Sequence, residues 1–175
     1  VGSIAIQIAK KVAGLTVIAT ASRSESGKWC KEMGADYVVN HYDLKTELET
    51  IGHGQVDYIL DFVDINGYWE TAVEIIKPQG HIVSITGNSN PLDLSLLKPK
   101  SVSFSFEFMY TRSMFTTEDI EEQHRILNRV ADLLDDGTFR TTLTTTLKGL
   151  SVDNLKKAHE MQESGKTIGK TVIEY

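Results

Sequence analysis

The sequence of 175 residues lacks most of the features that would indicate a secreted, membrane or metal-binding protein. Its single cysteine, Cys30, cannot form an intrachain disulfide. Neither the CxxC nor the HExxH spacing of metal centres occurs, so we expect no metal site in this segment. No secretory signal pattern and no apolar run of roughly 18 residues is present, so we expect neither export nor a membrane span. Together these absences predict a cytoplasmic protein.

The chain also lacks an excess of positive charge. Its 18 Lys and Arg residues stand against 24 Asp and Glu residues, giving a formal net charge of −6. Broad electrostatic capture of nucleic acid is therefore not expected. A hydrophobic content of 41% with 24% charged residues is typical of a globular domain. The length suits one α/β domain, and no linker divides it into two independent domains.

The first residues have the pattern of a helix that follows a nucleotide-binding turn. Gly2 leads directly into apolar positions that recur on one helix face. A glycine stop at Gly14 and a β-like run over 15–21 follow. A helix and then a strand, with glycine at the helix start, remain when a βαβ dinucleotide-binding unit loses its first strand and phosphate loop. The missing initiator methionine agrees with this, so we expect a chain that begins inside such a unit.

Strands and helices alternate along the rest of the chain, which predicts a parallel sheet covered on both faces. The fold class expected is therefore α/β, a Rossmann-type doubly wound sheet lacking its first strand and phosphate loop. In strand order 3-2-1-4-5-6 the absent strand is the central one, so the chain alone should be unstable or self-associating. Strands are expected at 15–21, 35–40, 56–63, 81–87, 101–109 and 171–175, and helices at about 24–34, 44–51, 69–76, 117–136 and 152–162, with a Thr-rich segment over 141–147.

Ser22 and Arg23 occupy the tip of the strand expected at 15–21. Folds that bind NAD commonly place an acidic residue there, about 20 residues beyond the glycine fingerprint, to hold the ribose hydroxyls. A hydroxyl and a guanidinium suit the 2′-phosphate of NADPH instead, because arginine donates paired hydrogen bonds to phosphate. NADPH is thus favoured over NADH, and the alternative interpretation is that Arg23 is a solvated loop cation.

The tips of the later strands provide further candidate ligand contacts. His41 ends the strand at 35–40, where it could contact the adenosine side of a ligand or simply lie on the surface. At the carboxyl edge, where doubly wound sheets bind ligands, lie Phe62, Val63, Thr86 and Gly87. Gly87 would let the backbone approach the nicotinamide ribose, and Val63 could cover one face of the cofactor. Without supporting geometry, Asp61 and Asp64 are not an acid–base pair.

Four segments together resemble the cofactor domain of the medium-chain dehydrogenase/reductase superfamily. The similarity is greatest to the zinc-independent quinone oxidoreductase branch, which includes bacterial proteins named zinc-type alcohol dehydrogenase-like. It extends over essentially the whole chain. The four segments are 1–10, 20–23, 33–41 and 165–172.

The resemblance implies a two-domain enzyme that transfers hydride from NADPH to a small quinone, enone or related carbonyl substrate. The whole of 1–175 would be a partial NADP(H)-binding domain, inactive alone, with about 141–175 returning toward an absent catalytic domain. Relatives that use zinc take its ligands chiefly from that absent domain, so this segment does not support zinc and neither confirms nor excludes it in the whole protein. An alcohol or aldehyde dehydrogenase and a non-enzymatic nucleotide sensor remain alternatives. A methyltransferase using S-adenosylmethionine fits less well, because it would need an acidic residue near Ser22.

The resemblance also assigns individual positions, although it identifies no catalytic residue. Gly2 matches the last glycine of the fingerprint, where close packing of helix and strand is needed. His41 stands where relatives often have tyrosine near the 2′-phosphate, and Lys166 is the nearest substitute for an arginine of that pocket. The strand at 102–108 would pair with a second subunit in a homodimer. Phe108 and Met109 would then line the nicotinamide site.

Overall fold

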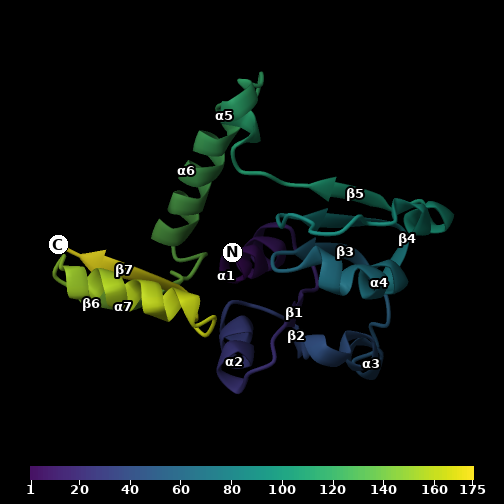
Figure 1. Cartoon of the computed structure of the whole chain (residues 1–175), viewed down its shortest axis with the longest axis horizontal. Coiled ribbons are helices and arrows are strands. Elements are labelled where there is room, and N and C mark those ends of the chain that lie inside the picture. The colour runs from purple at the N-terminus through teal and green to yellow at the C-terminus, as the bar shows by residue number, and fades with distance from the viewer. The chain divides into compact units, whose positions relative to one another are not determined.

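The computed structural model describes all 175 residues and divides them into two compact units. Unit 1 consists of residues 1–38 and 127–175, and unit 2 consists of residues 39–126. Figure 1 shows the succession of helices and strands along the chain. None of the helices combines the length and apolar character that crossing a membrane requires.

Unit 1 contains the two ends of the chain. Helix α1 (Gly2–Gln7) continues as a π-helical turn (Ile8–Val12), and a left-handed Gly14 with φ of 67° ends it. Strand β1 (Ile18–Thr20) pairs with β2 (Tyr37–Val39), and α2 lies between them in the sequence. Parallel strands β6 and β7 are joined by α7, as a parallel pair requires. The remaining bounds are α2 Ser24–Glu32, β6 Leu143–Lys148, α7 Val152–Glu163, β7 Lys170–Glu174 and α6 Glu122–Asp135, whose first turn belongs to unit 2.

Gln7 joins the two segments that form unit 1. Its side chain is fully buried, and its Nε2 donates to the carbonyl oxygen of Arg140 at 2.9 Å. The Arg140 main-chain N–H donates back to Gln7 Oε1 at 2.7 Å. This reciprocal pair satisfies buried polar groups on both sides. The apolar core beside it is small, consisting of Ile6, Ala19, Met33 and Ala35.

Unit 2 is built around a parallel sheet of order β3-β4-β5 (Figure 1). Asp61 at the end of β3 aligns with Ser84 on β4, which aligns with Phe106 on β5, so the carboxyl ends of the strands share one edge. The bounds are a 3-10 turn His41–Asp43, α3 Leu44–Thr50, β3 Val56–Asp61, α4 Ile65–Ile75, β4 Ile76–Ser84, a 3-10 helix Leu94–Lys100, β5 Ser103–Phe106 and α5 Thr111–Phe115.

The core of unit 2 forms where α4 packs on the sheet. Trp69 meets Phe104 of β5 edge to face, with ring centroids 5.5 Å apart. Ile82, in the middle strand, is fully buried. The buried cluster comprises Ile65, Trp69, Ala72, Ile76, Ile82 and Leu97.

The expected α/β class with parallel strands is confirmed, since β3, β4 and β5 form a parallel sheet in that order and β6 pairs with β7 in parallel. Several boundaries were wrong. The strand at 15–21 is only three residues long. The helix at 117–136 begins at Glu122, because residues 117–121 form turns in which the Ile120 N–H donates to the Thr117 oxygen and the Glu122 N–H to the Asp119 oxygen. The strand at 101–109 is confined to β5.

The strand expected at 81–87 begins earlier, because β4 already starts at Ile76 and ends at Ser84. Residues 77–80 form a bulge in this strand, so that Val56 pairs with Ile76 whereas Tyr58 pairs with His81. A Cβ on Gly80 would lie 2.9 Å from the main-chain oxygen of Asp57, too close for any other residue at this bulge.

Candidate functional site

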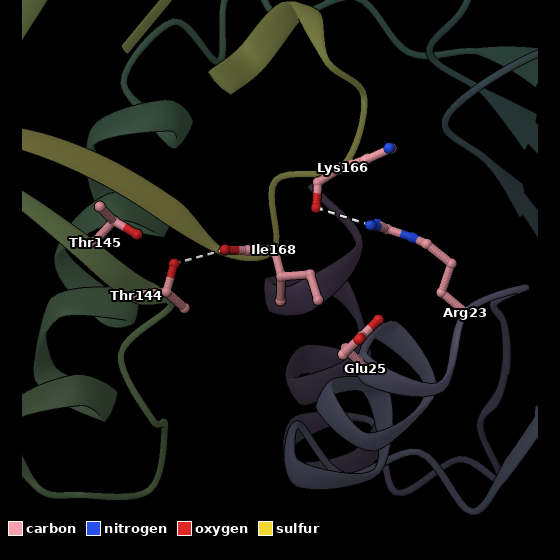
Figure 2. Close-up of a pocket in the computed structure, with 6 residues that line it drawn as sticks. All are labelled: Arg23, Glu25, Thr144, Thr145, Lys166 and Ile168. Carbon is pink, nitrogen blue, oxygen red and sulfur yellow. Dashed lines mark hydrogen bonds between the residues drawn. The ribbon is translucent and has the colours of Figure 1, made fainter. Parts of the chain in front are cut away.

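An open concavity of about 590 Å³ in unit 1 is lined by two cationic residues that the sequence singled out separately (Figure 2). Arg23 is the residue immediately before α2, and Lys166 belongs to the turn between α7 and β7. Arg23 Nη1 donates to the main-chain oxygen of Lys166 at 3.1 Å, joining positions 143 residues apart. The full lining is Arg23, Glu25, Thr144, Thr145, Lys166 and Ile168.

The turn that carries Lys166 is held by local hydrogen bonds. Gly165 is left-handed, with φ of 64°, and the Lys166 N–H donates to Ser164 Oγ at 3.2 Å. Thr167 Oγ1 donates to the carbonyl oxygen of Met161 at 2.7 Å, and Thr144 Oγ1 donates to that of Ile168 at 2.6 Å. The turn therefore offers Arg23 a carbonyl oxygen at a set position.

The chemistry of this concavity favours an anion. The Lys166 ammonium makes no hydrogen bond or ion pair, and Arg23 uses one donor on a neutral carbonyl. The guanidinium thus keeps its charge and several donors for a ligand. Glu25, in the first turn of α2, adds one carboxylate to the same lining. The residue pattern did not single out Glu25, Thr144, Thr145 or Ile168.

Two other predicted residues of unit 1 have few neighbours. Ser22 is exposed between β1 and α2. Gly2 begins α1, and a Cβ built on it would meet no atom within 4 Å. The close packing expected at Gly2 is therefore not provided by this chain.

In unit 2, the carboxylate of Asp61 ties together the tips of β3 and β4. Its Oδ2 accepts from Ser84 Oγ and from Thr86 Oγ1, each at 2.7 Å. Its Oδ1 accepts from the main-chain N–H groups of Val63 at 3.3 Å and Asp64 at 3.1 Å. The two hydroxyl oxygens lie 2.9 Å from each other. One carboxylate thus organises both loops at this edge.

Among the predicted residues at this edge, one has its polar group already hydrogen-bonded within the protein, and others are exposed. Thr86 Oγ1 bonds to Asp61 and accepts from the Ile65 N–H at 3.4 Å, so its hydroxyl is already occupied. Val63 is 80% exposed, and Gly87 has no atom within 4 Å of a built Cβ. Phe62 is half-buried. The groups open to a ligand here are consequently the Val63 side chain and the Gly87 backbone.

His41 and Phe108 lie elsewhere in unit 2. His41 begins a 3-10 turn, with its ring centroid 4.5 Å from that of Tyr42 and 6.4 Å from that of Tyr68. Phe108 follows β5 and is half-exposed, edge to face with Tyr110 at 5.4 Å. Met109 beside it is 64% exposed.

The side chains of this chain do not form a zinc site. No group of three or more His, Cys, Asp or Glu residues is arranged to hold a metal ion. Cys30 is half-buried beside the small core of unit 1, and burial raises the pKa of its thiol, so the protonated form is favoured.

Comparison with known proteins decides the family. The family model described as zinc-binding dehydrogenase matches residues 1–128, well over half of the chain. The chain belongs to the zinc-binding dehydrogenase family. This is the cofactor-binding part of the medium-chain dehydrogenase/reductase superfamily, a superfamily of oxidoreductases, as the sequence resemblance predicts.

Relatives in this family match the chain over nearly its whole length. A zinc-type alcohol dehydrogenase-like protein of Staphylococcus aureus (strain MSSA476) is 44% identical over 174 residues, which are 99% of this chain and 52% of that protein. An NAD-dependent alcohol dehydrogenase of Sulfolobus acidocaldarius is 29% identical, covering 98% of this chain and 46% of its own length. The chain spans about half the length of the curated relatives it matches.

Two solved structures that match nearly the whole chain have the same fold. A candidate zinc-dependent alcohol dehydrogenase of Rhizobium etli CFN 42 superposes with a TM-score of 0.91 at 43% identity, covering 99% of this chain and 51% of that one. The Escherichia coli quinone oxidoreductase complexed with NADPH gives a TM-score of 0.77 at 24% identity, covering 99% and 53%. The second likeness supports the fold alone.

Proposed function

We propose that this chain is the NADPH-binding part of an oxidoreductase that reduces a small quinone, enone or related carbonyl compound. Bound NADPH would supply the hydride. The residues of this chain would bind and orient the cofactor, with Arg23 and Lys166 at the 2′-phosphate and with Val63, Gly87 and Phe108 beside the nicotinamide. Ser22, His41, Phe62 and Thr86 complete the proposed set, and Gly2 would start the helix beside the diphosphate.

The observation that carries this proposal is the joint lining of one concavity by Arg23 and Lys166. A dianionic phosphate needs several donors and compensating charge, and these side chains provide both. The hydrogen bond to the Lys166 carbonyl holds the guanidinium without neutralising it. An Arg23 that merely faced solvent would have no such partner.

A second candidate is an alcohol or aldehyde dehydrogenase that uses NADH. Glu25 favours it, because a carboxylate in this lining could accept hydrogen bonds from ribose hydroxyls and would repel a phosphate. The names of the relatives, alcohol dehydrogenase-like and NAD-dependent alcohol dehydrogenase, point the same way. A sensor that binds the nucleotide without turnover is the third.

The test uses the full-length protein, titrated with NADPH and NADH, with Arg23→Ala and Glu25→Gln as variants. Arg23→Ala should raise the Kd for NADPH by about tenfold or more and leave the Kd for NADH unchanged, because a charged hydrogen bond contributes about 1.5–3 kcal/mol. Lys148→Ala is the matched control, since Lys148 is an exposed cation outside the concavity. It should change neither value.

Three results would redirect the assignment. Equal affinity of the wild-type protein for NADPH and NADH would contradict the proposal that Arg23 and Lys166 bind the 2′-phosphate. Tighter NADPH binding in Glu25→Gln together with an NADH preference in the wild-type protein favours the alcohol dehydrogenase. Tight NADPH binding without oxidation by any quinone, enone or aldehyde favours the sensor.

We further propose that the protein forms a homodimer through β5. This strand pairs only with β4, so one edge is unpaired, and Phe106 and Phe108 at its end are both about half exposed. Sedimentation of the full-length protein should give a dimer that Phe106→Arg converts to a monomer. A wild-type monomer at micromolar concentration would contradict this.

A further inference from the structure

Asp61 is bound by four donors, and none of them is charged. The donors are the hydroxyls of Ser84 and Thr86 and two main-chain N–H groups, and no Lys, Arg or His forms an ion pair with this carboxylate. Ser84 is fully buried, so its hydroxyl must have a partner inside the protein. Hydrogen bonds to a charged acceptor are stronger than neutral ones, and four of them restrain all the groups involved.

The restrained groups belong to two different loops at the same sheet edge. Val63 and Asp64 follow β3, whereas Thr86 follows β4 and precedes Gly87. Asp61 and Ser84 are neighbours in the parallel register, which sets their side chains side by side. The Ile65 N–H, at the start of α4, is also within 3.4 Å of Thr86 Oγ1. One carboxylate therefore holds both loops and the start of the helix in place.

We propose that Asp61 is the positioning residue for the nicotinamide end of the cofactor. It makes no contact with the ligand itself, but it sets the Val63 side chain and the Gly87 backbone, which are the groups left open at this edge. This inference rests on the proposed function. This role also explains why the Thr86 hydroxyl is hydrogen-bonded to Asp61 and is not left free for a ligand.

The experiment compares two ligands on the full-length protein. NADPH carries the nicotinamide, whereas 2′-phosphoadenosine diphosphate ribose has the rest of the molecule without that ring. Asp61→Asn replaces an acceptor by an NH₂ group that cannot accept from the donors facing it. We expect it to raise the Kd for NADPH by about tenfold and to lower kcat with menadione by about tenfold, and to leave the Kd for the ring-less ligand within about twofold.

The matched control is Asp57→Asn on the same strand. Asp57 is an exposed carboxylate paired with Lys77 at 2.8 Å, near the opposite end of β3. Its substitution should change neither Kd nor kcat. Circular dichroism melting of both variants shows whether each is folded.

A second pair of variants tests the same geometry if Asp61→Asn fails to fold. Thr86→Ser keeps the hydroxyl bonded to Asp61, and Thr86→Val removes it with little change of shape. Thr86→Val should lower kcat by about fivefold or more, and Thr86→Ser should restore at least half of the wild-type value. If Thr86 acted instead through a contact of its methyl group with the ligand, Thr86→Val would keep more activity than Thr86→Ser.

The outcomes separate this inference from the function on which it rests. If the wild-type protein binds neither ligand, the proposed function fails and the inference fails with it. If the wild-type protein binds both and Asp61→Asn weakens them equally, or leaves kcat unchanged, only the positioning by Asp61 is overturned.

Discussion

The two units of this chain differ in the contacts that stabilise each of them internally. Unit 2 is one continuous stretch, 39–126, with six buried residues packed between a helix and a three-stranded sheet. Unit 1 joins two distant stretches and has only four residues in its buried apolar cluster. Its long-range contacts include the polar links Gln7 to Arg140, Lys10 to Asp36 and Arg23 to Lys166. Unit 2 thus has the larger buried apolar cluster, whereas directed hydrogen bonds such as Gln7 to Arg140 join the two separate stretches of unit 1.

The candidate ligand groups differ in the same way. In unit 1, Arg23 and Lys166 keep unused donors beside an open concavity, which is what capture of an anion requires. In unit 2, the donors around Asp61 are all hydrogen-bonded to its carboxylate, which suits a residue that fixes the loops after β3 and β4. A charged residue with unused hydrogen-bond donors is therefore a candidate ligand contact, whereas one whose hydrogen bonds are all made within the protein is a candidate support.

The largest expected effect is on the core of unit 2. Ile82→Ala removes a fully buried side chain from the central strand and should lower the free energy of unfolding by about 2–5 kcal/mol. Ile85→Ala, at a position that is 39% exposed just beyond the same strand, should cost much less. Urea unfolding of the full-length protein, followed by far-ultraviolet circular dichroism, measures both. Equal losses would show that apolar burial does not dominate unit 2.

A smaller loss is expected from breaking the polar join of unit 1. Gln7→Leu keeps the volume but leaves the Arg140 N–H and carbonyl without their partner, which should cost about 1–3 kcal/mol. Gln162→Leu, on the exposed side of α7, serves as control and should stay within about 0.5 kcal/mol. If Gln7→Leu were as stable as the wild-type protein, the contrast between the units would not hold.

The smallest expected effect is the contribution of Asp36 to stability, which depends on pH. Hydrogen bonds from the Lys10 ammonium and the Val17 N–H hold the pKa of Asp36 below its usual range. A carboxyl whose pKa is lowered by folding adds stability above its unfolded pKa of about 4, and this is lost as pH falls through the folded value. Asp36→Asn should therefore lower Tm slightly near neutral pH, with a difference that vanishes in acid. Lys10→Met should show the same profile, and a difference that grows in acid would refute this cause.

Particular residues show how far the sequence could be interpreted. The apolar repeat after Gly2, the left-handed glycine at Gly14 and the strand at 56–63 were predictable, because periodicity and glycine stops act locally. The bulge at Gly80 was not, since it depends on how β4 pairs with β3. The helix start at Glu122 was also missed, because Thr117 and Asp119, which look like a helix start in the sequence, form a turn closed by their own hydrogen bonds.

The candidate site divides in the same manner. Arg23 could be singled out because a strand tip has a known place in a nucleotide-binding fold, and Lys166 because of the family pattern. Thr144 and Ile168 could not, because only the parallel pairing of β6 with β7 brings them beside Arg23. Asp61 was noticed as a carboxylate at a strand end, but its four donors become visible only when β3 and β4 are aligned.

By itself, the sequence determined the α/β class, the alternation of helices and strands, and the family, since these follow from hydrophobic period and from motifs within short segments. The tertiary structure alone decided which groups remain free to bind. A hydrogen-bond donor or acceptor is used up by neighbours that are distant in the chain, as the Arg23 guanidinium and the Asp61 carboxylate show. Whether a charged side chain is a contact or a support is therefore a property of the folded chain.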